Sequence, residues 1–133
     1  MKVEVSVNNK LAARWKHEKL FRHGYLAVPI AFLKYYANLK KFGGLTQSEA
    51  MFVLQVMSFK WDDRSPFPSY ATLAKRLGTG PKTVQRHAQS LEAKGYLKRE
   101  ARQGRSNAFE FTPLFDSLLE AVQEEDGGAP QAA

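Results

Sequence analysis

Apolar positions recur every three or four residues in two neighbouring stretches near the middle of the chain, which predicts two helices joined by a tight turn. The first helix is expected to begin at Ser69, whose hydroxyl can accept a backbone N–H, directly after Pro68. Gly78 is expected to end it, because glycine readily adopts the positive φ of a helix C-terminus. Its apolar stripe consists of Leu73, Ala74 and Leu77. Lys75 and Arg76 lie outside this stripe.

The second helix is expected over residues 81–94 and has two different faces. Pro81 stands at the first helical position, where its missing N–H costs nothing, and Gly95 follows the last turn. The inner side is apolar and is made by Val84, Ala88 and Leu91. The outer side holds basic and amide side chains without acids, namely Lys82, Gln85, Arg86 and Gln89.

That outer side suits the edges of DNA bases. Arginine can bind guanine O6 and N7 as a bidentate pair, and glutamine can do the same with adenine N6 and N7. A compact helix with such a face fits the major groove. The alternative interpretation is an ordinary amphipathic surface helix, because lysine, arginine and glutamine are good helix formers.

A basic β-hairpin is predicted directly after the second helix. Residues 96–100 and 107–111 form its strands, the second alternating and ending in aromatics, and Gly104 stands at the turn. Arg102 and Arg105 flank that glycine, where they could reach phosphates or a minor groove. Solubility of an exposed hairpin is the alternative role for these two arginines.

The run F-P-S-Y-A-T-L-A-K-R-L-G-T-G-P-K-T-V-Q-R-H-A-Q-S-L-E-A-K-G-Y-L-K-R resembles winged helix-turn-helix domains of bacterial transcription regulators and of phage and plasmid replication initiators. The resemblance covers roughly residues 45–111. It implies a recognition helix in the major groove, with Lys82, Thr83, Gln85, Arg86 and Gln89 facing the bases. We expect phosphate contacts from Lys75, Arg76, Lys98, Arg99, Arg102 and Arg105. The chain departs from the pattern at Gly80, where a serine or threonine cap is common.

The N-terminal part predicts a second β-hairpin. Lys2–Val7 alternates apolar and polar residues, Asn8-Asn9 is a turn candidate, and residues 11–15 alternate again. A second DNA-contacting arm, a dimerisation element and an extra hairpin on the domain edge all remain open as its role.

Two further helices are expected between this hairpin and the central pair. One runs from Pro29 to about Leu39. The other begins with a capping box of Thr46 and Glu49 and runs to about Lys60. This second helix is apolar on both sides, so we expect it to be buried on both. The central pair covers one side, and the 29–39 helix or a second copy of the chain covers the other.

The last helix is expected over residues 114–124 with Thr112 as its cap. Its apolar stripe of Phe115, Leu118, Leu119 and Val122 packs on the domain or forms a dimer seam. The predicted fold class is therefore mainly α with a small β-hairpin wing. We expect an N-terminal extension over residues 1–44, a winged helix-turn-helix domain with its C-terminal helix over 45–124, and a disordered tail over 125–133.

Charge is distributed unevenly along the chain. Residues 75–105 hold nine Lys/Arg and two acids, residues 1–74 hold eleven and five, and residues 106–133 hold six acids and no Lys/Arg. Positive charge therefore concentrates on the predicted helix-turn-helix and hairpin and on the N-terminal part, as phosphate binding requires.

The sequence favours a DNA-binding protein over an enzyme. It contains no cysteine, no apolar run long enough for a membrane span and no catalytic consensus, and its N-terminus does not resemble a signal peptide. His17 and His23 lack a matching ligand set, and Asp62 and Asp63 lack a third partner. We therefore expect no metal and no cofactor, and a cytoplasmic location.

The most favoured function is sequence-specific binding of double-stranded DNA by a transcriptional regulator, with a homodimer as a possibility. A DNA-binding module for replication initiation uses the same contacts and remains an alternative, although the short length favours a regulator. A winged helix used for protein–protein contacts is the third hypothesis, which does not require the basic outer face of residues 81–94.

Overall fold

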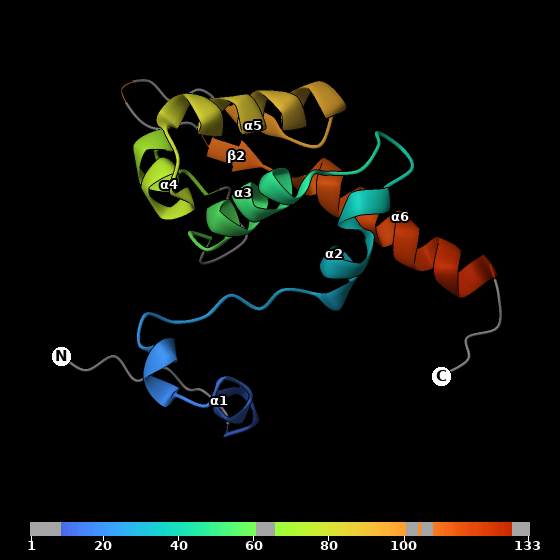
Figure 1. Cartoon of the computed structure of the whole chain (residues 1–133). Coiled ribbons are helices and arrows are strands. Elements are labelled where there is room, and N and C mark those ends of the chain that lie inside the picture. Colours follow the sequence, from blue (N-terminus) through green and yellow to red (C-terminus); the bar gives the residue numbers. More distant parts are fainter. Residues whose placement is uncertain (1–8, 61–65, 101–103, 105–107, 129–133) are drawn as a thin grey trace.

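The computed structural model describes residues 9–60, 66–100, 104 and 108–128. Helices α3, α4 and α5 and a two-stranded hairpin form one body, and α6 leads away from that hairpin alongside α2 (Figure 1). The elements of this body are α3 (Gln47–Met57), α4 (Tyr70–Leu77), α5 (Pro81–Lys94), β1 (Lys98–Glu100) and β2 (Ala108–Glu110). The flanking elements are α1 (Asn9–Trp15), η1 (Glu18–Phe21), α2 (Ile30–Tyr35), η2 (Tyr36–Asn38) and α6 (Thr112–Gly128).

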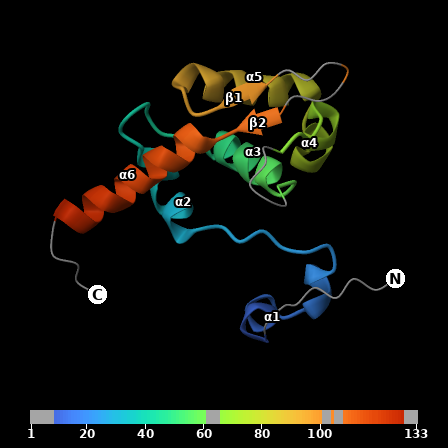
Figure 2. The ribbon, with the colours of Figure 1, turned by 180° about the vertical axis from the view of Figure 1, so that it is seen from behind.

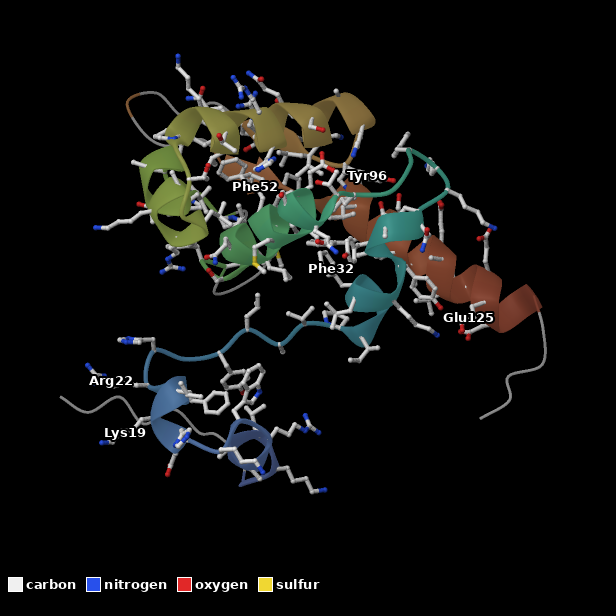
Figure 3. The ribbon with its side chains drawn as sticks, in the orientation of Figure 1. Lys19, Arg22, Phe32, Phe52, Tyr96 and Glu125 are labelled. Atoms are coloured by element: carbon white, nitrogen blue, oxygen red, sulfur yellow. The ribbon has the colours of Figure 1, made fainter. Side chains whose placement is uncertain are left out.

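Helix α3 lies at the centre and is buried on two sides, as expected. Phe52, Val53 and Val56 are almost fully buried and join one apolar cluster with residues of α4, α5 and the hairpin. The ring of Phe52 meets the edges of Phe109 and Phe111, with centroids 6.0 and 6.5 Å apart. Figure 3 shows Phe52 directed from α3 toward α5. The α3 core side therefore supports α5 from below.

The helix boundaries of α4 and α5 follow the predicted caps. The hydroxyl of Ser69 accepts the backbone N–H of Thr72 at 3.1 Å, and Pro81 opens α5. Gly78 and Gly95 both have positive φ, 67° and 89°, at the ends of the two helices. The turn between α4 and α5 therefore has the geometry that the glycine pattern indicates.

Replacing Ser69 with alanine is expected to cost about 1 kcal/mol of folding stability, because the N–H of Thr72 loses its acceptor. Urea unfolding of the two proteins measures the difference. Ser69→Asp keeps an acceptor at the cap and should retain most of the stability. A loss in Ser69→Asp equal to that in Ser69→Ala would contradict the capping role.

The two strands are shorter than expected but pair with each other as expected. Strand β1 pairs antiparallel with β2, with Arg99 opposite Phe109. The backbone N–H of Phe109 also donates to the carbonyl of Pro66 at 2.8 Å, which ties β2 to the segment before α4. Tyr96 and Leu97 are buried and lead into β1 rather than belonging to it. The wing residues 101–103 and 105–107 lie outside the described residues.

Helix α6 corrects two expectations. It starts at Thr112, whose N–H is accepted by Glu110 at 2.8 Å, and it continues to Gly128, so residues 125–128 are helical rather than part of a disordered tail. Leu114 is fully buried while Leu119 is 53% exposed. The buried face of α6 is shifted by about one residue from the predicted stripe. Leu114, which packs in the core cluster beside the hairpin, determines this face.

Helix α2 packs against α6 and supplies the second cover for α3. Phe32 is buried in the same cluster as Phe52, and its ring stacks on Tyr36 at 5.9 Å. The predicted 29–39 helix divides into α2 and the short 3-10 turn η2, and Lys34 pairs with Glu125 of α6 at 2.8 Å. Seen from behind in Figure 2, α2 and α6 lie together on the side of α3 away from α5.

The N-terminal hairpin prediction is wrong over residues 11–15, which form α1 instead of a strand. Lysine, leucine, alanine and arginine are strong helix formers, and Leu11 and Trp15 are spaced as i and i+4 neighbours as well as alternating positions. Three alternating residues are too few to distinguish the two-residue period of a strand from the 3.6-residue period of a helix. The proposed first strand, residues 2–7, lies outside the described residues.

No helix in the described ranges combines the length and the apolar character needed to cross a membrane.

Candidate nucleic-acid interface

The outer face of α5 carries four exposed side chains with hydrogen-bond donors, Lys82, Gln85, Arg86 and Gln89. The opposite face buries Val84, Ala88 and Leu91 completely. Figure 3 shows nitrogen-tipped side chains that project from α5 away from the core. Within the described part of the chain, none of the four takes part in a hydrogen bond or ion pair. Their donors are therefore free to bind an external ligand.

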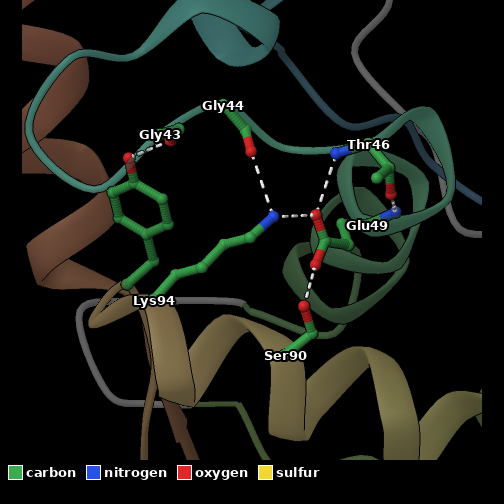
Figure 4. A network of polar contacts seen from close by, with 7 residues as sticks. Gly43, Gly44, Thr46, Glu49, Ser90 and Lys94 are labelled. Atoms are coloured by element: carbon green, nitrogen blue, oxygen red, sulfur yellow. Dashed lines mark hydrogen bonds and ion pairs between the residues drawn. The ribbon is translucent and has the colours of Figure 1, made fainter.

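The C-terminal end of α5 is held by a polar network around the buried Glu49 (Figure 4). The Lys94 ammonium donates to Glu49 Oε1 at 2.7 Å and to the carbonyl of Gly44 at 3.0 Å. The Ser90 hydroxyl donates to Glu49 Oε2, and the backbone N–H of Thr46 donates to Glu49 Oε1 at 2.8 Å. One carboxylate thus connects the start of α3 to two turns of α5.

This network keeps Glu49 ionised inside the fold. Burial raises the pKa of the carboxyl group, but hydrogen bonds from Lys94, Ser90 and the Thr46 backbone outweigh burial and hold the pKa below its ordinary value of 4.5. The charge of Lys94 acts in the same direction. The ionised carboxylate is the form that orients α5.

Residues 42–45 complete the support of α5. The Tyr96 hydroxyl donates to the carbonyl of Gly43, and the Phe42 ring meets the Tyr96 ring edge-on at 5.3 Å. Gly44 lies so close to Ala37 that a Cβ on it would stand 2.0 Å from the Ala37 carbonyl oxygen. This loop therefore needs glycine at position 44 to reach both η2 and α5.

Two of the predicted phosphate ligands, Arg76 and Arg99, contact other side chains of the protein. The Arg99 guanidinium pairs with Glu92 of α5 and donates to the Tyr70 hydroxyl, and these contacts raise the pKa of Arg99, with the Glu92 hydrogen bond as the largest cause. The guanidinium of Arg76 lies over the Phe59 ring at 4.2 Å and donates to Ser58 at 3.0 Å. Arg99 joins β1 to α4 and α5, and Arg76 joins α4 to the end of α3.

The remaining predicted ligands differ in position. Lys75 and Lys98 are exposed, on α4 and β1, while Thr83 is half-buried on α5. Arg102 and Arg105 lie outside the described residues. The structure thus brings together on one helix the four side chains of the outer α5 face, with Lys75 on the neighbouring helix.

Sequence reasoning did not find the Glu49–Lys94 pair. The pattern identified Glu49 as half of a capping box and Lys94 as a last-turn lysine, and both are true locally. Ser90 is half-buried at the side of the apolar stripe of α5, and its hydroxyl donates to Glu49; the helical period alone did not mark it as a partner of a buried carboxylate.

Within the described ranges, no three His, Cys, Asp or Glu side chains gather as a metal site requires.

Residues 43–97 match the family model of a helix-turn-helix domain. This stretch of the chain therefore resembles a helix-turn-helix domain. The matched range contains α3, α4 and α5, begins in the loop that contacts Tyr96 and ends directly before β1. The comparison with curated proteins found no match.

Three solved structures show low similarity to this chain. A possible transcriptional regulator from Methanosarcina mazei Go1 is 18% identical, with 71% of this chain and 77% of that chain covered and a TM-score of 0.42. A MarR family transcription regulator is 18% identical, with coverage of 87% and 69% and a TM-score of 0.45. A Rep–DNA complex is 13% identical, with coverage of 86% and 95% and a TM-score of 0.46.

Proposed function

We propose that this protein is a non-enzymatic, sequence-specific DNA-binding regulator of transcription whose helix α5 reads the major groove. The observation that carries the proposal is the outer face of α5, where four exposed donors have no partner inside the described chain. Base readout requires free hydrogen-bond donors on a helix whose opposite side is packed firmly against the protein.

Arg86 and Gln89 are proposed to read bases, because both lie on the outermost line of α5 and both can bind a base through two hydrogen bonds. Lys82 and Gln85 extend the same face toward the helix start. Thr83 stands at its edge as a further groove-facing candidate.

Phosphate contacts are proposed for Lys75, Lys98, Arg102 and Arg105. Lys75 and Lys98 are exposed to solvent. Arg76 and Arg99 already have internal partners, so we assign them the role of positioning α4 and the wing for binding.

The proposal is tested by selecting binding sites from a random duplex pool and titrating the selected site and scrambled DNA with salt. An enriched motif with a high specificity ratio supports base readout by α5. Palindromic half-sites would indicate a dimeric regulator, whereas tandem repeats would assign the protein to a replication origin. Salt-sensitive binding without a motif would contradict sequence-specific regulation, and the absence of binding at low salt would favour a protein-binding role.

Lys98→Gln is expected to weaken binding to selected and scrambled DNA alike, by severalfold, and to lower the slope of log K against log salt by about 1. The physical reason is the loss of one phosphate contact and its released counterion. Fluorescence anisotropy at several salt concentrations measures both quantities. Lys40→Gln removes an exposed charge beside α6 and is the matched control, with an unchanged slope expected. An unchanged slope in Lys98→Gln would remove this lysine from the interface.

A further inference from the structure

Residues 9–27 form an arm that the other described residues leave largely uncovered. The arm, residues 9–27, consists of α1, η1 and an irregular segment, and it lies apart from the main body in both views (Figures 1 and 2). Its buried contact is internal, with Phe21 packed edge-on against Tyr25 at 6.3 Å. Trp15 and Leu20 are each 60% exposed. Large apolar side chains left in water in this way indicate a surface that another partner covers.

The arm is also basic. It carries five Lys/Arg and one acid, and Lys10 and Arg14 are exposed one turn apart on α1. Figure 3 shows Lys19 and Arg22 projecting from the arm away from the body. The partner surface should therefore combine negative charge with some apolar area.

DNA bound to α5 would not contact the arm in this arrangement. The arm lies on the far side of α3 from α5, and the outer face of α5 points away from it (Figures 1 and 2). A duplex in contact with α5 leaves the arm facing the opposite direction.

Helix α6 carries the complementary surface. It contains five acids and no Lys/Arg, and its exposed side presents Asp116 and Glu120 one turn apart with Leu119 between them, 53% exposed. Asp116 and Glu120 have no hydrogen bond or ion pair to the described residues. The acidic pair and the basic pair of α1 have the same i, i+4 spacing.

We propose that two copies of this chain exchange their N-terminal arms, with the arm of each copy docked along α6 of the other. Lys10 and Arg14 then face Asp116 and Glu120, while Trp15 and Leu20 cover Leu119. A twofold arrangement uses both surfaces of both copies at once, so the assembly closes as a dimer. The irregular residues 24–29 can span roughly 20 Å, which gives the arm the reach to cross to a second copy.

Sedimentation equilibrium of the full chain without DNA tests the exchange. We expect a monomer–dimer equilibrium in the micromolar range. The arm-reversed chain carries Lys10→Glu with Arg14→Glu, and the α6-reversed chain carries Asp116→Lys with Glu120→Lys. Each chain alone should dimerise roughly tenfold more weakly or worse, because the reversals replace attraction by repulsion at both contacts.

The decisive sample is an equimolar mixture of the arm-reversed and α6-reversed chains. In their heterodimer the acidic arm of one meets the basic α6 of the other, and the native arm meets the native α6. Dimerisation should therefore return to within about threefold of the native value. Recovery also shows that both chains are folded, and Gln47→Glu with Met51→Glu on the exposed side of α3 is the control that should leave dimerisation unchanged.

A native chain that stays monomeric at high micromolar concentration would overturn the proposal, as would reversals that leave dimerisation unchanged or a mixture that does not recover it. Loss of DNA affinity in the arm-reversed chain together with a monomeric native chain would instead assign the arm to DNA. Dimerisation is measured without DNA, so its failure leaves the proposed function of α5 standing.

Discussion

Glu49→Ala is expected to lower the free energy of unfolding by about 2–3 kcal/mol, which corresponds to a melting point roughly 6–12 °C lower for a domain of this size. The carboxylate is almost fully buried and receives hydrogen bonds from Lys94, Ser90 and the Thr46 backbone. Its removal leaves the Ser90 hydroxyl and the Thr46 N–H without this acceptor and takes away one of the two acceptors of Lys94. The loss falls below that of a fully buried pair because Lys94 keeps the Gly44 carbonyl and is 27% exposed.

Urea unfolding measures this loss, and Glu124→Ala is the matched control. Glu124 forms an exposed pair with Lys40 at 3.2 Å, so its removal should change stability by less than about 0.5 kcal/mol. A double-mutant cycle with Lys94→Met isolates the coupling between the two groups. Equal effects of Glu49→Ala and Glu124→Ala would show that the network does not hold α5.

The contribution of Glu49 to folding stability should decrease as the pH is lowered. The folded-state pKa lies below the ordinary value of 4.5, so the stabilisation is fully present above that pH and is lost as the pH falls through the folded-state pKa. The stability difference between the native chain and Glu49→Gln should therefore narrow below pH 4.5. Unfolding curves from neutral to acid pH measure it, and a difference that widens in acid would contradict the assignment.

Arg86→Ala is expected to weaken binding to the selected DNA site by about 1–3 kcal/mol, or roughly 5- to 150-fold, and to relax sequence preference at one base position. The side chain is exposed on the outermost line of α5 and has no internal partner in the described chain, so its removal should leave the melting temperature unchanged. Anisotropy titrations with the selected site and with single-base variants measure both effects.

Arg86→Lys separates base readout from charge. Lysine keeps the positive charge but lacks the planar pair of donors that arginine offers to a base. We expect the lysine variant to lose most of the specificity while keeping the salt slope of the native protein. Equal losses on selected and scrambled DNA in Arg86→Ala would overturn its role as a base reader and would make it a phosphate contact.

The local signals predicted the central part of the fold well. Ser69, the capping box of Thr46 and Glu49, and the glycines at 78 and 95 act through neighbouring backbone atoms, and the structure confirms each of them. The outer and inner faces of α5 follow directly from the helical period. Such features depend on residues close in sequence, so the sequence alone contains their cause.

The flanks of the domain were predicted less well because their local signals were weak. The three alternating residues Leu11, Ala13 and Trp15 fitted a helix as well as a strand, and the structure has a helix. The inner face of α6 is determined by the packing of Leu114 beside the hairpin, and Leu119 was therefore assigned wrongly to the buried stripe. Local periodicity cannot distinguish alternatives that differ only in distant contacts.

The sequence by itself determined the boundaries of α4 and α5, the turn between them and the polar outer face of α5. The tertiary structure alone decided which charges remain available on that surface. It pairs Lys94 with Glu49, 45 residues away, and it takes Arg99 and Arg76 into internal contacts. The physical reason is that a charged side chain finds its partner through the packing of whole helices, and this packing joins residues that no local pattern connects.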